Sequence, residues 1–442
     1  MSATAVVPPA RRPAGRSRAV AGGQVGHSQV TVTAIVAAAV VFVTAYGVPL
    51  RMGATLGTVV ALGLIPVWIS DAWRSRAFRW IACLTVASLV SGFLLTELAT
   101  ADHGASRKAL LAQGWLLVGI VVAAGWIIWS RRFIPGWGIG LIFGLGLLAS
   151  VRPGAGMFAL NPWRFGFSVP VTVIALSIAW RLGRRWVDVV VALSLGVVSA
   201  LNDGRSTFAI LALTAIIVLW QGRRRETSRK RNAMHVALLL AGLAYVAYAG
   251  GQALILDGAL GEATQARTEA QIETSGSLLL GGRPEAAASA ALIAERPLGY
   301  GAGTAPSLAD VSRAKAAMAS INYDPDNGYV EKFMFGGRFE LHSVLADLWI
   351  WFGLAGAALA IVTLVVCGRA VILQIAQRAA PALLVFLVAK LLWNIWFSPV
   401  ESAAPLTALT LGLLLLGPAS PEKPAPPHRP SASSRAARPA AG

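Results

Sequence analysis

Runs of about twenty apolar residues recur along this chain from Val30 to Leu416, and each is long enough to cross the roughly 30 Å hydrocarbon layer of a membrane. The composition agrees, because 56% of the 442 residues are hydrophobic and 13% are charged, whereas a soluble protein carries roughly a quarter charged residues. A helix satisfies its own backbone hydrogen bonds in lipid. The sequence therefore predicts an all-α, polytopic integral membrane protein.

We expect twelve membrane-spanning helices, oriented by the basic residues that gather in alternate short loops. The formal net charge of +18 is spread over these loops, as in the run Arg223–Arg231, so it favours a role in topology over the binding of nucleic acid. Both termini and the basic loops are thereby predicted to be cytoplasmic. The predicted spans are approximately 30–49, 53–70, 80–99, 109–129, 137–151, 168–180, 186–201, 206–221, 235–256, 343–367, 380–397 and 400–416.

Residues 257–342 form the one long loop between spans, and the charge pattern puts them on the extracytoplasmic side. Within this loop we expect short helices at Pro284–Glu295 and Pro306–Ser320, the first of which opens with a proline. The tails, residues 1–29 and 418–442, are rich in Pro, Ala, Ser and Arg, and they are predicted to be disordered.

His342 and Ser343 stand where the long loop enters a span, and Gly353 and Gly356 follow in that span. On a helix at about 100° per residue, His342 and both glycines fall on one stripe. The glycines predict a close approach of a neighbouring helix. Because an imidazole can take a proton near neutral pH, His342 is predicted to be a general base.

Two arginines are predicted to face the same side of the membrane as His342. Arg283 follows Gly281 and Gly282 and directly precedes the helix at Pro284, so a guanidinium and free backbone N–H groups would together bind a phosphate. Glu285 in the first turn would compete for those N–H groups. Arg205 lies between two spans that have almost no loop, so it either faces a protein cavity or pairs with Asp203.

Three weaker patterns concern charged and glycine-rich segments. Lys390 and Asp347 lie at similar depths in two spans and are predicted to pair, either as a structural pair or lining the cavity. The glycines around Tyr300 favour a tight turn over a dinucleotide loop. Asp324-Pro325-Asp326 is read as a turn and not as a metal site, so no metal or other cofactor is predicted.

With these positions the chain resembles the superfamily of O-antigen ligases and O-antigen polymerases, and the resemblance extends over residues 30–416. Members are membrane transferases with about a dozen spans and one large extracytoplasmic loop. Asp203-Gly204 stands before Arg205 where members often carry a small hydroxyl residue. The matching motifs are the loop-end pattern at His342–Gly356, the Gly282-Arg283 pair with the Pro-Leu-Gly-Tyr-Gly turn at Pro297–Gly301, and the arginine that opens a span at Arg205.

The resemblance implies a glycosyltransferase that moves a glycan from an undecaprenyl-diphosphate type of carrier to an acceptor hydroxyl, with inversion and without metal, in surface polysaccharide biosynthesis. His342 would be the base, and Arg205 and Arg283 would bind the diphosphate. Tyr300 in the matching turn and Asp347 below His342 are included among the expected substrate-binding residues. The partners would be the lipid-linked donor, the acceptor glycan or other hydroxyl compound, and membrane lipids.

These motifs do not distinguish a ligase from a polymerase, and two other classes remain open. A transporter or flippase of lipid-linked oligosaccharide would account for twelve spans and for Lys390 and Asp347, but it gives no reason for a loop that ends in His342. Broken spans at matching places in two halves would favour it. A glycan-strand polymerase of the shape, elongation and division type typically relies on a carboxylate in its loop.

Overall fold

Every regular element of the protein is a helix in the residues that the computed structural model describes, which are 21–154, 156–222, 242 and 283–415. No strand occurs within these ranges, which confirms the predicted all-α class. In chain order the helices are α1 (Ala21–Tyr46), η1 (Arg51–Gly53), α2 (Leu56–Gly63), α3 (Ile65–Trp73), α4 (Arg76–Ala99), α5 (Arg107–Ser130), α6 (Gly136–Ala149), α7 (Gly156–Leu160), η2 (Trp163–Phe167), α8 (Ser168–Leu182), α9 (Arg185–Leu201), α10 (Arg205–Gly222), α14 (Glu285–Glu295), α15 (Leu308–Ala319), η3 (Val330–Met334), α16 (Val344–Ala376), α17 (Ala382–Phe397) and α18 (Val400–Leu414).

Five of the described helices are long and apolar enough to cross a membrane: α4, α5, the continuous helix η2–α8, α10 and α16. Shorter apolar helices accompany them, namely Thr31–Tyr46 within α1, α6, α17 and α18. Helices of this composition make the chain a membrane-embedded protein. The predicted span 53–70 is not one straight helix, because α2 and α3 meet at an angle of 78°. The predicted span 235–256 lies outside the described residues.

The bend between α2 and α3 has a local cause. Pro66 stands in the first turn of α3, and a proline has no backbone N–H with which to continue the preceding helix. Trp68 then ties the two helices together, because its indole nitrogen donates to the carbonyl of Ala61 over 2.8 Å. The ring of Trp68 lies against Gly125 of α5, where a β-carbon would overlap it.

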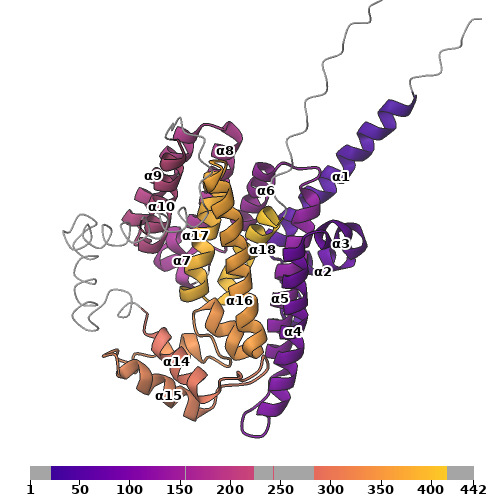
Figure 1. The fold of residues 1–442 in the computed structure, drawn as a ribbon. Helices are drawn as coiled ribbons and strands as arrows, with labels where there is room; N and C mark the ends of the chain where they lie inside the picture. The colour runs from indigo at the N-terminus through magenta and orange to yellow at the C-terminus, as the bar shows by residue number, and fades with distance from the viewer. Residues whose placement is uncertain (1–20, 155, 223–241, 243–282, 416–442) are drawn as a thin grey trace, which may run out of the picture.

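The last three helices run through the middle of the bundle, as the orange and yellow ribbons show, with α8, α9 and α10 on one side and α4 and α5 on the other (Figure 1). Small residues bring these layers together. Gly92 of α4 leaves no room for a β-carbon beside Phe352 of α16, and Gly412 of α18 leaves none beside Ile127 of α5. Helices packed through glycine approach closely, which replaces the hydrophobic driving force that lipid does not supply.

The two ends of the bundle differ in charge and cover. At one end, called the basic end, arginines follow or precede the spans: Arg132 donates to Asp71 over 2.7 Å, and Arg185 donates to the carbonyl of Arg378. The other end, called the loop end, is covered by α14 and α15 (Figure 1). These two helices confirm the short helices predicted in the long loop, with bounds within two residues of those expected.

Gly353 interrupts α16 and thereby attaches the loop end to the bundle. Its backbone (φ 64°, ψ −152°) breaks the helix, so nearby carbonyls lose their partners within α16. The carbonyl of Ile350 accepts instead from the N–H groups of Tyr300 (2.8 Å) and Gly301 (3.0 Å). A β-carbon on Gly353 would overlap the carbonyl of Leu298. The glycine therefore seats the Pro297–Gly301 turn on α16.

The predicted helical stripe through His342 needs correction in two respects. α16 begins at Val344, because Ser343 caps it and accepts from the N–H of Ala346 over 3.2 Å. His342 thus stands before the helix, and the break at Gly353 separates it further from the glycines. The predicted close approach of a helix at Gly353 is confirmed, since a β-carbon there would lie 3.0 Å from Leu95 of α4.

A network around His103 fastens the loop between α4 and α5 to α15. Nδ1 of His103 lies 2.9 Å from Oδ1 of Asp102, and Nε2 lies 2.8 Å from Oδ2 of Asp310. Asp310 also accepts from the backbone N–H (2.8 Å) and the hydroxyl (2.6 Å) of Ser307, which caps α15. Arg296 pairs with Asp102. These contacts hold the covering helices at a fixed place over the spans.

We expect Asp310→Asn to lower the unfolding temperature at pH 7. Burial raises the pKa of Asp310, but hydrogen bonds from Ser307 and His103 outweigh it, so the pKa lies below the ordinary 3.8. A lowered pKa in the folded protein adds stability above the unfolded value, and this is lost as the pH falls through the folded value. The difference from wild type should therefore shrink below about pH 4.

Thermal unfolding in detergent across this pH range tests the prediction, with Asp324→Asn as the control. Asp324 is exposed and accepts from the N–H of Asp326 over 2.9 Å, a bond that asparagine can also make. Equal unfolding temperatures for wild type and Asp310→Asn at pH 7 would contradict the role given to the network.

Candidate active site

His342 occupies a constrained position at the loop end. Its φ of 55° lies in the left-handed region, which non-glycine residues seldom adopt and which recurs at functional sites. The constraint comes from Ser343, whose hydroxyl donates to the carbonyl of Ile395 over 2.9 Å while its oxygen caps α16. Nδ1 of His342 is buried and makes no hydrogen bond among the described residues. A buried, unused imidazole nitrogen is suited to exchange a proton with a bound molecule.

Tyr329 and Glu285 form the side of the site next to His342. The rings of Tyr329 and His342 lie 5.8 Å apart, inclined by 35°. The Tyr329 hydroxyl donates to Oε1 of Glu285 over 2.5 Å, and Oε2 of Glu285 is buried without a hydrogen-bond partner in the described ranges. Burial raises the pKa of Tyr329, and the Glu285 carboxylate raises it further. Tyr329 therefore keeps its proton and acts as a donor.

Arg283 lies beside these residues on an aromatic surface. Its guanidinium carbon is 5.4 Å from the centre of the Trp393 ring and 5.5 Å from that of Phe397, both on α17. The two rings are themselves 4.7 Å apart. The positive charge of Arg283 acts on Tyr329, where it opposes the rise in pKa. Arg283, Glu285, Tyr329 and His342 are called the His342–Arg283 cluster from here on.

The structure thus brings together two of the three residues predicted to do the chemistry. Arg205 lies in a different group, at the start of α10. Asp203 accepts from Arg164 over 2.9 Å and lies 3.5 Å from Nε of Arg205. Of the two readings left open by the sequence, pairing with Asp203 is the one observed. α10 packs along α17, so Arg205 lies at the same end of the bundle as Arg283.

No family model, curated protein or solved structure matches this chain. Its function has to be argued from the residues of the site.

Tyr300 and Asp347 are buried and do not face a ligand, which corrects the prediction that both bind substrate. Tyr300 has no exposed surface and packs between His103 and Phe339, with ring centres at 5.5 and 4.7 Å. Asp347 also has no exposed surface. Its two carboxyl oxygens accept from the N–H groups of Leu341 (2.6 Å) and Val400 (3.0 Å).

The predicted pair of Lys390 with Asp347 is also wrong. Asp347 uses both oxygens on backbone groups, and no ion pair joins it to Lys390. The bonds of Asp347 have another consequence, because Leu341 directly precedes His342. Asp347 therefore positions the backbone of the proposed base from below.

Tyr329 and Glu285 were not predicted as site residues. Glu285 was expected to compete with an anion for the N–H groups at the start of α14, but its side chain turns to Tyr329 instead. Nothing in the sequence near Tyr329 marks it, because its partners are 44 and 13 positions away. Trp393 and Phe397 carried a usable signal: two aromatic residues one helical turn apart at the end of a span that also contains Lys390.

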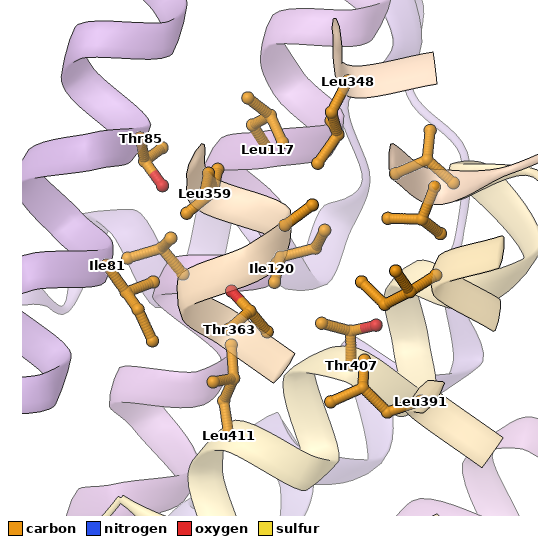
Figure 2. Close-up of a pocket in the computed structure, with 15 residues that line it drawn as sticks. Ile81, Thr85, Leu117, Ile120, Leu348, Leu359, Thr363, Leu391, Thr407 and Leu411 are labelled. Atoms are coloured by element: carbon orange, nitrogen blue, oxygen red, sulfur yellow. The ribbon is translucent and has the colours of Figure 1, made fainter. Parts of the chain in front are cut away.

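No group of three or more potential metal ligands occurs among the residues that the structure describes. Asp324 and Asp326 form the turn expected for them, in which Asp326 also pairs with Lys315 over 2.7 Å. A cavity of about 30 Å³ lies deeper, between α4, α5, α16, α17 and α18, and Figure 2 shows its leucine, isoleucine and threonine lining. It has room for about one water molecule, so it belongs to the packing of the spans.

Proposed function

We propose that the protein is a membrane glycosyltransferase, similar to O-antigen ligases and polymerases, that transfers a glycan from a polyprenyl diphosphate to an acceptor hydroxyl. The observation that carries this proposal is the placement of His342 and Arg283 in one cluster. A base without a partner and a cation without a carboxylate partner among the described residues are the two groups that such a transfer needs. One takes a proton, and the other stabilises a leaving anion.

The proposed step is a displacement at the anomeric carbon of the donor glycan. The acceptor oxygen forms the new glycosidic bond, while the bond from the anomeric carbon to the diphosphate oxygen breaks. The leaving diphosphate takes the bonding electrons, and His342 takes the hydroxyl proton. Arg283 offers its planar N–H groups to the phosphate oxygens, and Tyr329 keeps His342 in place through the contact of their rings.

The same proposal sets the orientation in the membrane. Basic residues gather at the end of the bundle opposite α14 and α15, as in the Arg132–Asp71 and Arg185–Arg378 contacts. Cytoplasmic loops carry the excess of Lys and Arg. This supports cytoplasmic termini and a His342–Arg283 cluster on the extracytoplasmic face, where lipid-linked glycans would meet their acceptors.

Arg283→Ala is expected to reduce glycan transfer by about 100-fold, because removal of one group that stabilises a developing anion has effects of about that size. Transfer would be measured with purified protein in nanodiscs, an undecaprenyl-diphosphate oligosaccharide and an acceptor glycan, with products separated by mass. Arg107→Ala is the matched control, since Arg107 is exposed at the start of α5. Full transfer by Arg283→Ala would reject the role of this residue.

The rival class, a transporter or flippase of lipid-linked oligosaccharide, gains one observation and loses another. The bend of 78° between α2 and α3 is the kind of broken span that transporters use. The second break, at Gly353, exposes the carbonyl of Ile350, but Tyr300 and Gly301 already occupy it. Movement of the lipid-linked glycan across a vesicle membrane without transfer to the acceptor would favour this class over the proposed one.

A further inference from the structure

Lys390 is a charged residue in the interior of α17, among apolar neighbours. Trp393 and Phe397 follow it at three and seven positions, so all three side chains share one face of the helix. At 1.5 Å per residue, Lys390 lies about 10 Å along the axis from Phe397, at the depth of the lipid acyl chains. A lysine at this depth is costly and is seldom found without a partner.

No carboxylate accounts for Lys390 among the described residues. Asp347, the nearest candidate by sequence, is bonded to two backbone N–H groups. Glu285, the carboxylate of the His342–Arg283 cluster, accepts from Tyr329. Lys390 also makes no ion pair within the described ranges, which leaves its positive charge uncompensated there.

The charged side chain that acts most directly on Lys390 is another cation. Arg283 lies close enough to Lys390 for the two positive charges to repel each other. Arg283 itself is held over Trp393 and Phe397, the two aromatic residues on the Lys390 face of α17. Repulsion between like charges is strong in a medium of low dielectric constant, so both side chains would gain if an anion lay between them.

Snorkelling, in which a lysine extends its chain toward water, does not account for this arrangement. Snorkelling relieves the cost of burial by moving the ammonium group toward solvent, and it gains nothing from a second cation in its path. The arrangement is instead that of a site in which two cations bind one anion with several negative charges.

We propose that Lys390 and Arg283 together bind the diphosphate of a polyprenyl carrier, with Arg283 at the loop end and Lys390 deeper along α17. This inference rests on the proposed function and adds a residue to it. Lysine is a point charge and arginine a planar fork, and a diphosphate offers one phosphate group to each. A monophosphate cannot span both, so the site would distinguish the diphosphate from the monophosphate of the same lipid.

The test is a binding measurement on the full chain in nanodiscs with undecaprenyl diphosphate and undecaprenyl monophosphate. Lys390→Met should weaken diphosphate binding by about 10- to 100-fold, the range for one hydrogen bond to a charged group, and should change monophosphate binding less. It should also raise the unfolding temperature of the ligand-free protein, because the repulsion with Arg283 is removed. Lys390→Arg should keep most of the affinity. Lys108→Met, at an exposed lysine of α5, is the matched control.

The outcomes separate this inference from the proposed function. If wild type binds neither lipid, the proposed function fails and the inference fails with it. If wild type binds the diphosphate and Lys390→Met binds it equally well, only the inference is overturned. A lower unfolding temperature in Lys390→Met with unchanged preference for the diphosphate shows a structural lysine and also overturns it. If Lys390→Met does not fold, Lys390→Gln is measured in the same way.

Discussion

Replacing His342 with alanine should lower kcat for glycan transfer by about 10²- to 10⁴-fold, the contribution of a general base, while donor binding stays within a few-fold of wild type. The reason lies in the position of the ring. His342 is held in a left-handed conformation, and its buried Nδ1 has no hydrogen-bond partner among the described residues. Its removal breaks no hydrogen bond of Nδ1 within them, so folding should be little affected.

Three measurements on the same preparation test this expectation: transfer to the acceptor, binding of the polyprenyl-diphosphate donor, and thermal unfolding. Loss of transfer with donor binding and unfolding temperature retained is the expected pattern. His342→Gln is the companion variant, since its amide can fill the space but cannot take the proton. Wild-type kcat in His342→Ala would refute the role of this residue. A loss of transfer that matches a loss of folded protein would mean that His342 acts through the structure.

The helices and two of the site residues could be predicted because their signals are local. Apolar runs define helices whatever their neighbours are, and Gly353 marks a close approach because it has no side chain. Arg283 and His342 stand at the two ends of the covering layer, at a helix start and a helix entry. Such positions leave backbone groups and side chains available for a ligand, and a sequence shows where they are.

The partners of charged residues could not be predicted because they are set by the packing of distant segments. Asp347 and Lys390 lie at similar depths, but depth does not say which way each helix faces. The structure gives Asp347 to the N–H groups of Leu341 and Val400. Those N–H groups belong to a chain segment and to a helix start, which are as effective as a lysine at satisfying a buried carboxyl group.

Tyr300 and the α2–α3 bend show the same limit. The glycines around Tyr300 correctly indicated a turn, but the burial of its ring depends on the break in α16 at Gly353, which exposes the carbonyl of Ile350 to the turn. Pro66 is consistent with the start of a helix as well as with a kink, and the hydropathy of residues 53–70 is the same in both cases. Only the contact of Trp68 with Gly125 separates the two.

Asp347→Ala should destabilise the protein by about 2–6 kcal/mol, because it leaves two buried N–H groups without an acceptor and each costs about 1–3 kcal/mol. Asp347 has no exposed surface, so water cannot replace it without opening the structure. Asp347→Asn keeps one oxygen and turns an NH₂ group toward the other N–H, so an intermediate loss is expected. Thermal unfolding gives the size of the effect, and hydrogen exchange at Leu341 and Val400 shows its place.

Glu97→Ala is the matched control, because Glu97 is an exposed acid near the end of α4 and its removal should leave the unfolding temperature unchanged. Asp347 reaches the proposed base through the chain, since its bond to Leu341 fixes the residue next to His342. Transfer by Asp347→Asn should therefore fall further than its stability loss accounts for. If Asp347→Ala unfolds like wild type and both amides stay protected from exchange, the two hydrogen bonds do not hold this junction, and another contact must position His342.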